Sequence, residues 1–81
     1  MRDIKKLRFQ LVGKVFDLDM VNLILNKNGY KEINLNSNSL YTLIEYGLIN
    51  VDNLIITTAL EEFEGELYFT VVNITEKYEG D

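Results

Sequence analysis

The side chains of this sequence that could do chemistry are mainly carboxylates. Its 81 residues include no histidine and no cysteine, so the commonest general base, the commonest metal ligand and any thiol nucleophile are missing. Four glutamates crowd one short segment, at Glu61, Glu62, Glu64 and Glu66, but their spacing lacks the D-x-D-x-D-G pattern of a calcium loop. We therefore expect no metal site and no cofactor.

Two other candidate pairs for catalysis are explained by helix ends. Asp17 and Asp19 form a carboxylate pair, but Asp17 is well placed to cap a helix and Asp19 to complement the dipole of that helix. Ser37 and Ser39 are the only serines. Without histidine, either serine would need a lysine or carboxylate base, and the asparagines around them favour capping. We expect a protein that is not an enzyme.

Charge is distributed unevenly along the chain. The net charge of −5 divides into +4 for residues 1–31, with seven cations and three anions, and −9 for residues 32–81, with one cation and ten anions. Two interpretations are open: the halves pack together and partly neutralise each other, or the acidic half offers a surface to a basic partner. The glutamates of 61–66 are either a solvated turn or an imitation of phosphate spacing.

Length and composition indicate one small globular domain that spans residues 1–81. Hydrophobic residues make up 47% of the chain and charged residues 26%, as in ordinary globular proteins. No apolar segment approaches the length that crosses a membrane. We therefore expect no membrane partner and a cytoplasmic location.

The first half of the chain predicts a strand and two helices. Alternating apolar and polar residues over 6–16 predict a half-buried strand. Residues 17–28 predict a helix that Asp17 caps and Gly29 ends. Residues 31–35 are either a short strand or an extended connection. Ser37, Asn38 or Ser39 then caps a second helix, which runs to about residue 46 and ends at Gly47.

The second half predicts a β-hairpin of residues 53–62 and 66–78, which are rich in Ile, Val, Thr, Tyr and Phe. A three-residue loop, 63–65, would place Gly65 in the left-handed position. That register pairs Leu60 with Tyr68, Ile56 with Val72 and Leu54 with Ile74. The whole chain thus predicts an α+β fold of order β-α-(β)-α-β-β. Its antiparallel sheet has three or four strands, with two helices on one face.

This register leaves a second set of apolar side chains on the other face of the hairpin. Leu67, Phe69 and Val71, with Ile55 nearby, would form an exposed patch near the limit that monomers tolerate. The simplest cover is the same patch on a second copy, so we expect a homodimer. The competing explanation is that other elements bury both faces of the sheet.

One run of residues resembles a known family. Residues 39–49, SLYTLIEYGLI, followed by the hairpin at 54–74, resemble the recognition helix and wing of winged-helix proteins, where L-x-x-x-G-L-I often closes the helix. The resemblance implies a DNA-binding regulator. This run, however, has no lysine or arginine and carries Glu45, and the wing is acidic. DNA binding would then be lost.

Together these features predict a small, acidic, non-enzymatic interaction protein. Its composition resembles that of many phage and mobile-element proteins. One alternative is an inhibitor that masks a basic nucleic-acid-binding site of a host protein, and another is a degenerate winged-helix regulator. Lys6, Arg8 and Lys14, with Arg2 and Lys5 upstream, are the only candidate nucleic-acid footprint, and Phe16 is the only aromatic residue on that face. We expect no nucleic-acid partner.

Overall fold

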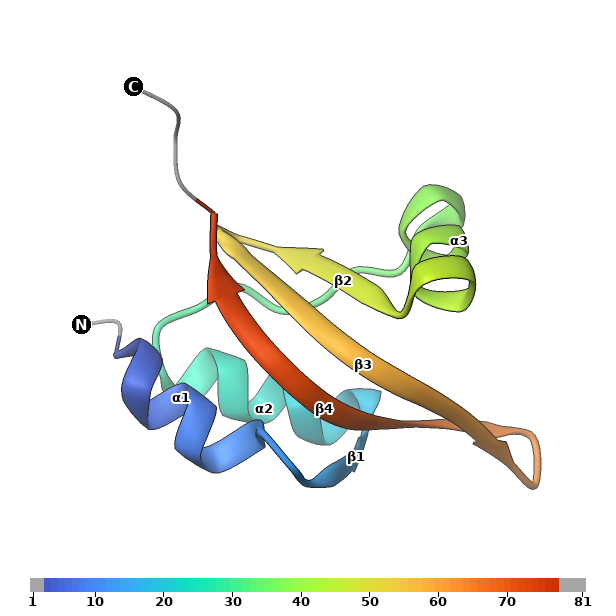
Figure 1. Cartoon of the computed structure of the whole chain (residues 1–81), viewed down its shortest axis with the longest axis horizontal. Coiled ribbons are helices and arrows are strands. Elements are labelled where there is room, and N and C mark those ends of the chain that lie inside the picture. Colours follow the sequence, from blue (N-terminus) through green and yellow to red (C-terminus); the bar gives the residue numbers. More distant parts are fainter. Residues whose placement is uncertain (1–2, 78–81) are drawn as a thin grey trace.

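The computed structural model describes residues 3–77 and has an α+β fold (Figure 1). In chain order the elements are α1 (Ile4–Leu11), β1 (Val15–Asp17), α2 (Leu18–Lys27), α3 (Ser37–Tyr46), β2 (Leu48–Val51), β3 (Leu54–Phe63) and β4 (Glu66–Glu76). The four strands form one sheet of order β1-β4-β3-β2, with antiparallel neighbours throughout. The predicted fold class is therefore confirmed, with one more helix than expected.

Helix α1 corrects the prediction of a strand over 6–16. Asp3 caps the helix by accepting a hydrogen bond from the Lys6 amide (3.1 Å). Leu7 and Leu11 are both buried, and their spacing of four residues is helical. Phe9, which completed the apparent alternation, is 82% exposed. Only the end of the predicted strand forms β1, which pairs with β4.

Helix α2 begins and ends where the sequence predicts. The Asp17 carboxylate accepts from the Met20 amide (2.9 Å), and Lys27 lies in the last turn. Gly29 follows with a left-handed φ of 84°. The segment after it forms no strand, so residues 31–35 are an extended connection. The Ile33 amide fixes this connection to α2 by donating to Asn22 Oδ1 (2.7 Å).

Helix α3 ends where the sequence predicts but begins earlier, at Ser37, because its cap is Asn36 rather than Ser37, Asn38 or Ser39. Asn36 and Ser39 form a capping box, in which each side chain accepts a hydrogen bond from the other residue's backbone amide. The helix ends at Gly47, which has a φ of 67°. The Gly47 carbonyl accepts from the amide of Thr58 (2.7 Å) and from its hydroxyl (3.1 Å), so this end of α3 is tied to β3.

The hairpin register differs from the prediction at both the turn and the middle of the strands. Phe63 pairs with Glu66, so the loop contains only Glu64 and Gly65, with φ of 51° and 81°. Two positive φ angles are typical of a type I′ turn. Gly65 does adopt the predicted left-handed conformation, but the three-residue loop is wrong.

A β-bulge at Val72 shifts the rest of the ladder. Thr58 pairs with Val71 and Thr57 with Asn73, so Val72 has no partner on β3. Leu60 therefore faces Phe69, Ile56 faces Ile74 and Leu54 faces Glu76, and all three predicted pairs are wrong. The bulge turns Val71 and Ile74 to the same side of the sheet, and both are buried.

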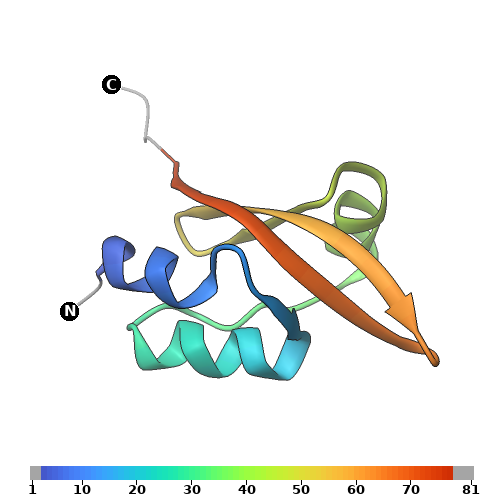
Figure 2. The same ribbon diagram turned by 60° about the horizontal axis from the view of Figure 1, so that its bottom comes forward.

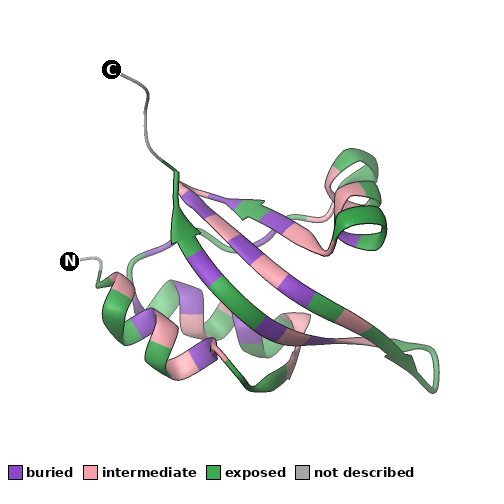
Figure 3. Cartoon of the chain, in the orientation of Figure 1, coloured by how far each residue is buried: buried purple, intermediate pink, exposed green. Residues whose placement is uncertain are grey.

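The core lies between the sheet and helices α1 and α2, which pack together and against β4 (Figure 2). Buried residues alternate with more accessible ones along β3 and β4 (Figure 3). The largest fully buried side chains are Phe69, Leu7, Leu11, Leu25, Leu43, Leu54, Ile56, Ile74, Val21 and Val71. Helix α3 lies apart from α1 and α2 and packs against β2 and β3.

Candidate interaction site

The residues predicted to interact with partners form two groups: the glutamates of the hairpin are exposed, and the apolar residues of β4 lie inside the protein. Glu61, Glu62, Glu64 and Glu66 are exposed at the free end of the hairpin, which projects beyond the helices (Figure 1). Among residues 3–77, no ion pair joins these four glutamates to a cation. The acidic hairpin tip, defined as residues 61–66, therefore presents uncompensated negative charge to solvent.

The predicted apolar patch is wrong. Phe69 is 1% exposed and Val71 is 1% exposed, while Leu67 is partly buried. The bulge and the two-residue loop turn these residues toward α1 and α2 instead of away from them. The dimer face that the sequence predicted is part of the core. The competing explanation, that both faces of the sheet are buried, is also wrong, because Val72 on the other face is 54% exposed.

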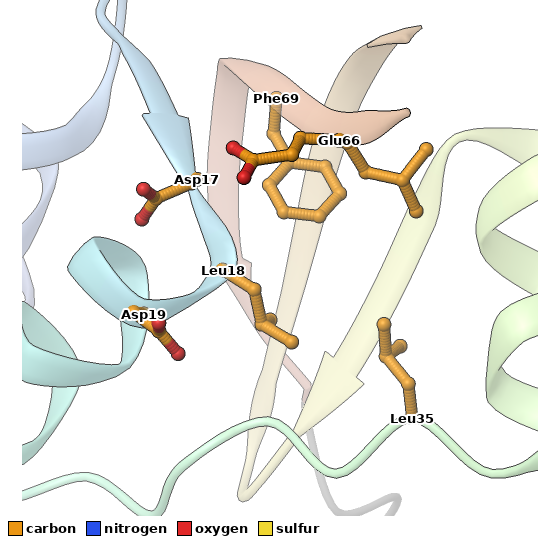
Figure 4. A pocket seen from close by; sticks show the side chains of 7 residues that line it. Asp17, Leu18, Asp19, Leu35, Glu66 and Phe69 are labelled. Atoms are coloured by element: carbon orange, nitrogen blue, oxygen red, sulfur yellow. The ribbon is translucent and has the colours of Figure 1, made fainter. Parts of the chain in front are cut away.

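A groove lies between the start of α2, the start of β4 and the extended connection before α3. Its volume is about 320 Å³. Its lining consists of Asp17, Leu18, Asp19, Leu35, Glu66, Leu67 and Phe69 (Figure 4). Four apolar residues and three acidic residues thus line the same hollow, which we call the acidic groove.

The carboxylates of the acidic groove belong to different elements. Asp17 and Asp19 lie at the start of α2, where negative charge is stabilised by the helix dipole. Glu66 is the first residue of β4, and its Oε2 accepts a hydrogen bond from the Tyr68 hydroxyl (3.1 Å). This hydrogen bond raises the pKa of Tyr68 above its ordinary value, and the charge of Glu66, partial loss of solvent and the charge of Asp17 add to the effect in that order. The phenol is therefore a neutral donor at neutral pH.

The lining of the acidic groove, with acidic residues beside apolar ones, is chemically suited to a cation that has an apolar part. Within the described residues, no three histidine, cysteine or acidic side chains are arranged to hold a metal ion. The Ser39 hydroxyl, a candidate nucleophile, takes part in the capping box of α3. The sequence did not reveal that Leu35 lines this groove. No residue next to Leu35 indicates that the segment between α2 and α3 passes close to the start of β4.

A second, polar hollow of about 260 Å³ lies beside the start of α3. It is lined by Asn36, Asn38, Ser39, Thr42, Leu48 and Asn50. Asn36 and Ser39 bond to each other, and the Thr42 hydroxyl donates to the Asn38 carbonyl (3.0 Å). The hydrogen bonds of these polar groups therefore stabilise the first turns of α3.

The predicted basic face does not exist as a sheet surface. Lys6 and Arg8 belong to α1, and Lys14 follows that helix. Arg8 is partly buried, and its Nε donates to the Ile74 carbonyl of β4 (2.8 Å). Arg8 is thus used to hold α1 on the sheet, whereas Lys5, Lys6 and Lys14 are exposed.

Helix α3 and the hairpin follow one another as the winged-helix resemblance implies, and α3 lies apart from α1 and α2 (Figure 1). Helix α3 contacts β2 and β3, and nine residues separate it from α2. Its exposed face carries Tyr41, Ile44 and Tyr46, and the two tyrosine rings pack edge to face with centroids 6.3 Å apart. This surface is apolar rather than basic.

Comparison with known proteins gives no further assignment, because no protein-family model, curated protein sequence or solved structure matches the chain. Among residues 3–77, no helix is long and apolar enough to cross a membrane. The function therefore has to be inferred from the surfaces described above.

Proposed function

We propose that the chain is a non-enzymatic interaction protein that binds a basic partner through its acidic hairpin tip. The observation that carries the proposal is the unpaired charge of Glu61, Glu62 and Glu64 on a hairpin end that projects from the body of the molecule. A surface of one sign attracts a partner of the other sign and speeds their encounter.

The shape of the tip supports the same proposal. The type I′ turn carries Glu64 and joins the two paired strands that carry the other glutamates, so that all four are presented in fixed register rather than on a loose loop. Fixed charges lose less conformational entropy on binding than flexible ones. A basic groove that ordinarily holds nucleic acid is a partner of suitable charge, as the inhibitor hypothesis requires.

A binding assay with two charge-matched variants tests the proposal. The hairpin variant carries Glu61→Gln, Glu62→Gln and Glu64→Gln, and the control carries Glu32→Gln, Glu45→Gln and Glu76→Gln. All six residues are exposed, and both variants lose three negative charges. The probe is a fluorescent deca-lysine peptide, and its binding is followed by anisotropy at low and high salt.

The hairpin variant is expected to bind the peptide about tenfold more weakly than the control, because three exposed ion pairs contribute roughly 0.5 kcal/mol each. Wild-type binding should also weaken as salt rises. Equal losses in the two variants would show that only net charge matters, and the tip would then have no special role.

A further inference from the structure

An exposed aromatic side chain on α1 has three lysines near it. Phe9 is 82% exposed. Lys5 and Lys6 precede it by four and three residues on the same helix, so they share its face. The Lys14 Nζ lies 5.6 Å from the centre of the Phe9 ring and 3.4 Å from the Phe9 carbonyl oxygen. We call this cluster the Phe9 knob.

The Phe9 knob and the acidic groove are complementary in chemistry. The knob has an apolar ring with three cations near it, and the lining of the groove combines four apolar residues with three acidic ones. The groove volume of about 320 Å³ is at the small end of ligand pockets, so it suits one large side chain rather than an extended ligand. Both surfaces are open in the single chain.

We propose that this protein associates with itself through these two surfaces, with the Phe9 knob of one copy inserted into the acidic groove of a second copy. The ring contacts the apolar residues of the groove while Lys5, Lys6 and Lys14 approach Asp17, Asp19 and Glu66. Charge complementarity between two surfaces of the same chain selects a second copy as the occupant. The proposal shares only Glu66 with the acidic hairpin tip, so Glu61, Glu62 and Glu64 stay free for another partner.

Sedimentation equilibrium measures this association. The contact is small, so it is weak, and the wild-type protein is examined up to about 1 mM at low salt. The average mass should rise above the 9.4 kDa of one chain as concentration increases. The rise should shrink at high salt. Phe9→Ala should weaken the association at least about tenfold, as for an aromatic anchor.

Charge exchange identifies the two surfaces. The knob variant carries Lys5→Glu and Lys6→Glu, and the groove variant carries Asp19→Lys and Glu66→Lys. Each variant alone should be monomeric, because like charges then face each other. An equimolar mixture should regain the association, since each altered surface has a complementary partner. Circular dichroism of each variant verifies the fold.

The matched control is Glu32→Lys with Glu45→Lys, which changes the net charge by the same amount as the groove variant and alters exposed residues elsewhere. This control should still associate. The proposal is overturned if the wild type remains at 9.4 kDa throughout. It is equally overturned if Phe9→Ala or the groove variant associates like the wild type, or if the mixture stays monomeric.

Discussion

The close approach of Gly47 to β3 makes Gly47→Ala the sharpest test of the fold. A Cβ at this position would lie 2.6 Å from the Thr58 carbonyl oxygen, and the φ of 67° is left-handed. The conformation alone costs an alanine roughly 1–2 kcal/mol. The Thr58 backbone cannot easily retreat, because its amide already donates to the Gly47 carbonyl (2.7 Å). Overpacking adds roughly 1–3 kcal/mol, so the expected loss is about 3 kcal/mol.

Gly65→Ala is the matched control for Gly47→Ala. Gly65 also has a left-handed φ, of 81°, but a Cβ there would have nothing within 4 Å. It should therefore cost only the conformational part, about 1 kcal/mol. Urea denaturation of both variants gives the two free energies of unfolding. The difference of about 2 kcal/mol reports the contact with Thr58. Equal losses would refute the close approach of α3 to β3.

Three further outcomes are expected. Phe69→Ala should cost about 3–5 kcal/mol in urea denaturation, whereas exposed Phe63→Ala should change stability by less than about 0.5 kcal/mol; the opposite ranking would mean that the other face of the hairpin is buried. Glu66→Gln should lower the pKa of Tyr68 in a difference absorbance titration against Tyr68→Phe, because the Glu66 hydrogen bond and charge raise it. Since that pKa is raised in the folded state, its small contribution to stability is present below the ordinary tyrosine pKa and is lost as pH rises through the folded value; an unchanged pKa in Glu66→Gln would contradict this assignment. Duplex DNA should show no gel shift at protein concentrations below about 1 µM at physiological salt, since α3 has no cation; a tight complex would restore the winged-helix hypothesis.

The sequence was informative where a local signal has one meaning. Asp17 and Gly29 mark the two ends of α2, and Gly47 marks the end of α3, because capping depends on neighbouring backbone groups only. The acidic groove, by contrast, forms because the segment that contains Leu35 passes close to the start of β4. No residue near Leu35 signals this approach, so this part of the candidate site could not be predicted.

Two local patterns fitted more than one structure. Leu7 and Leu11 belong to an alternating series and to a helical one, and the exposed Phe9 made the alternation look complete. Asp3, which caps α1, was the signal for the helix. In β4, Val71 and Val72 are adjacent and equally apolar, so either could face inward. The register then depended on a bulge that composition does not reveal.

Because Val72 is an extra residue in β4, the hairpin can lose one residue of this strand and still form a complete ladder. If β4 lost Thr70, Val72 would take the inward place of Val71, and Asn73 and Ile74 would keep their partners on β3 in a regular ladder. An insertion in β4 could not be absorbed in this way, because it would move every following side chain of the strand to the opposite face of the sheet. Bulges bend and twist a strand. The shortened hairpin would therefore be straighter, and its glutamates would leave the body of the protein in another direction.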